Sequence, residues 1–95
     1  VIIMTHDENG GWWDHVPPPM GDRWGPGSRI PALVISPLAK KGYVDHTISD
    51  TNSILRFISR VHGLAPLDGV AARDKAFERR GHAPLGDLTT TLAFD

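Results

Sequence analysis

The sequence predicts an α/β fold, because two short apolar runs typical of strands precede one stretch of helical periodicity. The first run is residues 1–4 (VIIM), and the second is residues 32–35 (ALVI), bracketed by Pro31 and Pro37. Glycines and prolines crowd the interval between them. The expected order is therefore strand, long loop, strand, loop and helix.

Both strands are expected to be buried on both faces in a parallel sheet, because their apolar residues are consecutive rather than alternating. Pro31 fits at the start of the second strand, where a missing backbone donor is tolerated. The chain begins at Val1, inside the first run. We therefore expect an amino-terminal part to be missing and residues 1–95 to form a single partial domain.

Residues 9–31 are predicted to form a long irregular loop, because their glycines and prolines disfavour helices and central strands. Loops of this length in compact domains are usually functional or disordered. Trp12, Trp13 and Trp24 argue against disorder, since their large rings need a surface to pack on.

The clearest helix is predicted after residue 51, where apolar residues recur at helical spacing: Ile54, Leu55, Ile58 and Val61. Asp50 or Thr51 is the expected cap, and Gly63 the expected end. Arg56 and Arg60 are expected to face outward. Residues 64–95 are predicted to be a weakly structured tail, with a short charged helix from Val70 to Arg80 that Gly81 ends.

Composition excludes several classes of function. The net charge is −1 and the longest basic runs are the pairs Lys40-Lys41 and Arg79-Arg80, so no nucleic-acid partner is expected. The absence of cysteine excludes disulfides, thiolate metal sites and cysteine nucleophiles. No stretch is apolar for long enough to be a transmembrane segment.

Asp7 and Glu8 are the first candidate site, because they follow the first strand directly and precede Asn9 and two glycines. Ligands bind at the carboxyl ends of strands in open α/β sheets. Carboxylate oxygens suit magnesium, calcium, manganese or zinc, and a cation relieves the repulsion between neighbouring acids. The alternative is a turn in which both acids are solvated, and the residues alone leave both interpretations open.

His15 could be a metal ligand, a proton donor, or a group oriented by Asp14, but a turn histidine packed on proline is the commoner case. Alternation along an extended chain would point His6 away from Asp7, which favours a packing role. No constellation of serine, histidine and acid is present, and no nucleophile is evident.

Residues 5–19 (THDENGGWWDHVPPP) closely resemble a signature of the bacterial phosphoesterase family. This family contains the phosphocholine-specific phospholipases C and the AcpA-type acid phosphatases. The resemblance continues through residues 22–37, 41–47 and 50–55, and it weakens after residue 63.

The resemblance implies the carboxyl-terminal portion of an alkaline-phosphatase-like α/β/α sandwich. In such enzymes a metal-bound serine or threonine hydroxyl attacks phosphorus. Asp7 and Glu8 match the family's acidic metal-binding pair, for a divalent ion whose identity stays open. The nucleophile and the other ligands would lie upstream, so no catalytic residue is expected here apart from His15 as a candidate accessory residue.

The implied partners are a phosphate-ester substrate, phospholipid included, and the missing amino-terminal part of the same enzyme, in a periplasmic or secreted location. The isolated chain is expected to be inactive. The alternative function is a non-catalytic module whose tryptophan-rich loop binds a carbohydrate or a protein. That alternative predicts that Trp12, Trp13 and Trp24 are exposed together as one patch.

Overall fold

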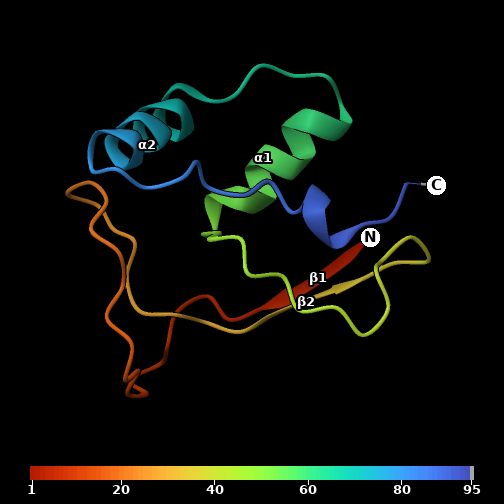
Figure 1. Ribbon diagram of the computed structural model, residues 1–95, viewed down its shortest axis with the longest axis horizontal. Coiled ribbons are helices and arrows are strands. Elements are labelled where there is room, and N and C mark those ends of the chain that lie inside the picture. The colour runs from red at the N-terminus through yellow and green to blue at the C-terminus, as the bar shows by residue number, and fades with distance from the viewer. Residues whose placement is uncertain (95) are drawn as a thin grey trace.

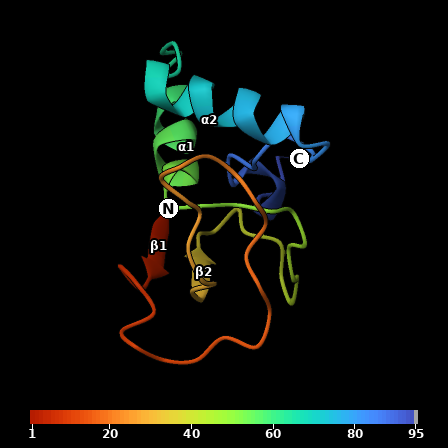
Figure 2. The same cartoon turned by 90° about the vertical axis from the view of Figure 1, so that its left-hand side faces the viewer.

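The computed structural model describes residues 1–94 and confirms a mixed α/β fold (Figure 1). Its elements are β1 (Ile2–Thr5), β2 (Ala32–Ile35), α1 (Asn52–Val61), α2 (Asp68–Arg79) and a 3-10 helix at Thr89–Thr91. The helices lie at one end of the molecule and the strands at the other (Figures 1 and 2). Among residues 1–94, neither helix is long and apolar enough to cross a bilayer.

The sheet differs from the predicted one in direction and in burial. β1 and β2 are antiparallel, with Ile2 opposite Ile35 and Thr5 opposite Ala32. Ile2 and Leu33 are 60% and 62% exposed, so the prediction of a parallel sheet buried on both faces is wrong. A continuous apolar run does not encode strand direction, and the face of the sheet that carries Ile2 and Leu33 is exposed to solvent.

Residues 6–31 form the predicted irregular loop, which leaves β1, rises toward α2 and returns to β2 (Figure 2). Hydrogen bonds across its base hold its two arms together. The Thr5 hydroxyl donates to the Pro31 carbonyl at 2.8 Å, and the Asn9 amide donates to Ser28 Oγ at 2.8 Å. The loop is thus closed near the sheet.

α1 matches the predicted helix, and Gly63 ends it with a φ of +63°. Thr51 occupies the cap position without a side-chain capping bond. Instead, Ser53 Oγ accepts the Asp50 amide at 3.0 Å. Arg56 does not face outward as expected, because only 8% of its side chain is exposed and it forms two ion pairs.

Residues 64–94 are more ordered than the sequence pattern predicts for the tail. The expected charged helix is present as α2, and Gly81 follows it with a φ of +78°. The buried hydrophobic residues of the described chain all lie in this segment: Val70, Phe77, Leu85 and Leu92. Val70 and Phe77 are seven positions apart and so share one face of α2, a stripe too narrow to stand out in a charged sequence.

The carboxyl-terminal segment runs between the helices and the sheet (Figure 1). Its backbone pairs with the loop after β2, because Lys40 N donates to the Thr91 carbonyl at 2.9 Å and Ala93 N donates to the Leu38 carbonyl at 2.8 Å. Gly86 N also donates to the Ile48 carbonyl at 2.9 Å. These bonds join the tail to the segment that leads into α1.

Gly21 marks the closest approach of the long loop to α2. A Cβ atom at this position would lie 2.5 Å from both the Gly25 carbonyl oxygen and Phe77 Cε2. We expect Gly21→Ala to lower the free energy of unfolding by about 1–3 kcal/mol, because overpacking forces the loop away from the helix. Urea denaturation followed by circular dichroism measures this change.

Gly27→Ala is the matched control, since nothing lies within 4 Å of its Cβ position. That substitution should leave stability unchanged or raise it slightly through the unfolded state. Equal effects of the two substitutions would contradict the close packing of Gly21.

Candidate functional site

Asp7 and Glu8 lie immediately after β1, and both are exposed. Asp7 Oδ1 accepts the Glu8 backbone amide at 3.0 Å. Within residues 1–94 neither carboxylate forms an ion pair with an arginine, lysine or histidine. Both acids are therefore available to an external cation.

The donor chemistry fits a divalent ion only in part. Divalent ions in proteins take four or more ligands, and hard cations favour carboxylate oxygens. Asp7 and Glu8 supply such oxygens, but residues 1–94 contain no group of three or more His, Asp or Glu side chains placed to hold one ion. The pair can therefore supply part of a ligand set, and the remaining ligands must come from elsewhere.

Two glycines turn the chain after the acid pair. Gly10 and Gly11 have φ values of +64° and +85°, a region that glycine enters without steric cost. The Asn9 side chain holds this turn, because its Oδ1 accepts Gly11 N at 3.2 Å while its Nδ2 donates to the Trp12 carbonyl at 3.2 Å. The sequence Asn-Gly-Gly thus determines how the loop leaves the acids.

Asp14 bonds to Arg29 rather than orienting His15. Its carboxylate accepts Arg29 Nη2 and Nε, both at 3.0 Å, and the backbone amide of the same arginine at 3.0 Å. These hydrogen bonds hold the pKa of Asp14 well below its ordinary value of 3.8. His15 is exposed, and its proposed accessory role stays a prediction. Arg29 was missed because 15 residues separate it from Asp14.

A depression of about 410 Å³ includes His6 and Asn9, which flank the acid pair in the sequence, but neither Asp7 nor Glu8 lines it. It is lined by His6, Asn9, Trp12, Trp13, Asp14, Arg29, Ile30 and Pro31. Trp12 and Trp13 are 79% and 89% exposed, so their indole rings are available to a ligand. Trp24 is exposed as well but does not line this depression, and the Arg23 guanidinium stacks over its ring at 4.4 Å. The three tryptophans are thus exposed without lining one common depression.

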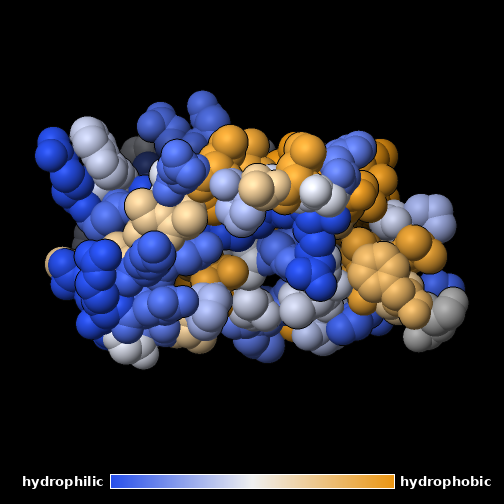
Figure 3. Space-filling view, turned by 90° about the horizontal axis from the view of Figure 1, so that it is seen from above, coloured by the Kyte–Doolittle hydropathy of each residue, from blue (hydrophilic) through white to orange (hydrophobic). Residues whose placement is uncertain are grey.

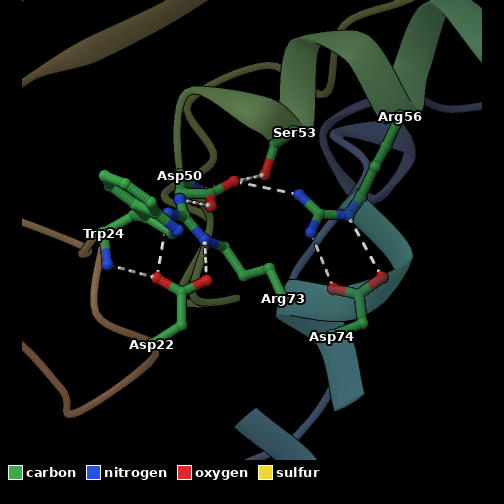
Figure 4. A network of polar contacts seen from close by, with 7 residues as sticks. All are labelled: Asp22, Trp24, Asp50, Ser53, Arg56, Arg73 and Asp74. Atoms are coloured by element: carbon green, nitrogen blue, oxygen red, sulfur yellow. Dashed lines mark hydrogen bonds and ion pairs between the residues drawn. The ribbon is translucent and has the colours of Figure 1, made fainter. Parts of the chain in front are cut away.

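A buried ionic network joins the long loop to both helices (Figure 4). Arg73 on α2 contacts Asp22 of the loop and Asp50 before α1, each with a closest distance of 3.0 Å. Arg56 on α1 contacts Asp50 at 2.9 Å and Asp74 on α2 at 2.6 Å. The hydrogen bonds from Arg73 lower the pKa of Asp22.

Viewed from the side of the helices, apolar side chains gather over part of the surface, and a strongly hydrophilic region lies beside them (Figure 3). The exposed apolar residues of α1 and the turn after it are Leu55, Ile58, Val61 and Leu64. A globular domain of ordinary size covers such a stripe with a second layer.

The family model described as the phosphoesterase family matches residues 1–65. The chain belongs to the phosphoesterase family. This confirms the resemblance expected from the residues that surround the acid pair and the tryptophan-rich loop.

Curated relatives of this phosphoesterase chain include phospholipase C B of Mycobacterium tuberculosis, which is 32% identical over 99% of the chain and 21% of that protein. Non-hemolytic phospholipase C of Burkholderia pseudomallei is 29% identical over 99% of the chain and 17% of that protein. The chain thus spans about a fifth of the length of these relatives. No solved structure gives a significant match.

The Asp14–Arg29 ion pair predicts how the stability of the fold depends on pH. Because the folded-state pKa of Asp14 lies below 3.8, its contribution to stability is complete above that pH and is lost as pH falls through the folded-state pKa. We expect Arg29→Gln to raise the Asp14 titration midpoint toward 3.8. Carboxyl-carbon NMR measures the midpoint, and an unchanged value would contradict the ion pair.

Proposed function

We propose that this chain is part of a metal-dependent phosphoester hydrolase of the phospholipase C or acid phosphatase type. Asp7 and Glu8 would supply part of its metal site. The observation that supports this most strongly is the position of two exposed carboxylates without cationic partners at the end of β1, within the segment that the family model matches.

A bound divalent ion would supply Lewis-acid stabilisation of charge on a phosphoryl oxygen. The chain's own part is to present the two carboxylates and to fix the turn behind them. The turn behind the carboxylates is fixed by the hydrogen bonds of Asn9 and by the positive φ values of Gly10 and Gly11. The nucleophile would come from other segments of the enzyme, and His15 is an accessory candidate.

Exposed apolar surface supports a larger fold around this chain, and we propose the alkaline-phosphatase-like α/β/α sandwich. β1 and β2 expose Ile2, Met4, Leu33 and Ile35 on one face, as a strand pair would if the layer that covers this face were absent. The relatives, about five times longer than this chain, have the length to supply that layer. The same expectation applies to the apolar stripe of α1.

A second candidate function is a non-catalytic module that binds a carbohydrate or a protein. The depression that Trp12 and Trp13 share favours it, because exposed indole rings provide stacking surfaces for such ligands. The position of Trp24 outside that depression is contrary to the single patch that the idea predicts. Loss of activity on removal of metal separates the two functions.

The test uses the polypeptide as its gene encodes it, with Asp7→Asn and Glu8→Gln as the variants. Each is expected to reduce hydrolysis by about 100-fold or more, because a neutral amide or a lost ligand weakens the hold on the metal. Release of p-nitrophenol from p-nitrophenyl phosphorylcholine and from p-nitrophenyl phosphate measures diesterase and monoesterase activity separately.

Glu78→Gln is the matched control, because Glu78 is exposed on α2, away from the acid pair. Its activity should equal that of the unsubstituted enzyme. Dialysis against a chelator should abolish activity, and an added divalent ion should restore it. Full activity of Asp7→Asn, or activity that survives the chelator, would refute the proposal.

A further inference from the structure

The loop between β1 and β2 is attached at residues 21–22 to two residues of α2 and to Arg80, which directly follows that helix. Arg73 Nε donates to Asp22 Oδ2 at 3.0 Å, and its Nη2 donates to Asp22 Oδ1 at 3.3 Å. Arg80 Nε donates to the Gly21 carbonyl at 2.8 Å. Gly21 itself packs so tightly against Phe77 that a Cβ atom does not fit.

The guanidinium of Arg73 is itself held in place. Its Nη1 donates to Asp50 Oδ2 at 3.0 Å, and Asp50 is only 5% exposed. Asp50 also accepts Arg56 Nη1 at 2.9 Å, so two arginines share one buried carboxylate (Figure 4). Removing one partner of such a network leaves an uncompensated buried charge, so breaking the contacts of Asp50 is costly.

The attachment at Asp22 affects the whole loop. Asp22 and Gly25 exchange two backbone hydrogen bonds, at 3.1 and 3.3 Å, and the Asp22 carboxylate also accepts Trp24 N at 2.8 Å. The ion pair of Asp14 with Arg29 then joins the two arms of the loop closer to the sheet. A loop of this length, held only at its ends, would sample many conformations.

We propose that Arg73 is a positioning residue of the phosphoester site. By holding Asp22, it fixes the middle of the loop that continues directly from Asp7 and Glu8. The two arms of this loop, residues 6–14 and 29–31, carry the residues that line the adjoining depression. This role rests on the proposed function, because it concerns the placement of groups around the acid pair. Arg73 acts only through Asp22 and the loop, and it is not a catalytic residue.

The first measurement is steady-state kinetics of the encoded polypeptide with Asp22→Asn and with Arg73→Lys. Asp22→Asn removes the charge that holds the loop but leaves the contacts of Arg73 and Arg56 with Asp50 intact, so the helices should remain folded. We expect kcat to fall about tenfold and KM to change less than about twofold, since misplaced groups weaken the transition state more than the ground state.

The effects of Asp22→Asn and Arg73→Lys on kcat should be less than additive in the double variant, because both substitutions remove the contact between Arg73 and Asp22. Arg79→Lys is the matched control, since Arg79 is exposed on the same helix and forms no ion pair within residues 1–94. Its kcat should equal that of the unsubstituted enzyme.

The second measurement reports the position of the loop without using activity. In the encoded polypeptide, a fluorescent amino acid incorporated at position 24 in place of Trp24 reports the mobility of this turn. Its fluorescence anisotropy should fall on Asp22→Asn and on Arg73→Lys, because the turn that contains position 24 is released. Arg79→Lys should leave the anisotropy unchanged.

The outcomes separate the two proposals. Unchanged anisotropy in Asp22→Asn refutes the attachment, and a fall in anisotropy with unchanged kcat refutes the positioning role. An unsubstituted enzyme that hydrolyses neither ester refutes the proposed function and the role assigned to Arg73 in it, even where the anisotropy shows that the attachment exists.

Discussion

Asp50 forms ion pairs with Arg56 and Arg73, and only 5% of its side chain is exposed. The arrangement of the helices and the long loop depends on these contacts. Charges so far from solvent are tolerated only when opposite charges and hydrogen bonds surround them. Each arginine therefore reaches a second carboxylate, Asp74 or Asp22, that is less buried. One network thus fixes the start of α1, the body of α2 and the middle of the long loop.

The small apolar core explains why a polar network has this importance. Buried hydrophobic residues of the described chain lie on α2 and in the segment after it, and no hydrophobic side chain of β1, β2 or α1 is fully buried. Hydrophobic burial alone therefore does not determine where the loop lies relative to the helices. The contacts of arginine with carboxylates determine the position of the loop, because a planar guanidinium donates hydrogen bonds in only a few directions.

Local features of the fold could be predicted from the sequence, whereas long-range pairings could not. Apolar spacing and Gly63 predict α1 correctly, and the glycines and prolines predict the loop. Strand direction depends on how the loop returns, which no local pattern specifies. Arg56 was expected to face solvent because it lies opposite the apolar stripe, yet a polar helix face is buried when carboxylates from elsewhere in the chain meet it.

In the candidate site, too, local features could be predicted from the sequence and long-range contacts could not. The position of Asp7 and Glu8 at the end of a strand follows from an apolar run that stops at charged residues, and β1 ends at Thr5. The contact of Asp14 with Arg29 could not be predicted from the sequence, because contacts between loop residues leave no periodic pattern. The metal role of the acid pair stays a prediction that depends on ligands outside this chain.

The two-stranded ribbon also has a consequence for the behaviour of the chain in solution. Among residues 1–94 each strand pairs with one neighbour, so each has an outer edge of amides and carbonyls that no strand pairs with, flanked by apolar side chains. Such edges act as templates for intermolecular β-pairing. Pro31 and Pro37 on either side of β2, and the negative charges of Asp7 and Glu8 after β1, oppose that pairing as gatekeepers. The acids proposed to bind a metal therefore lie where negative charge disfavours edge-to-edge pairing of the ribbon.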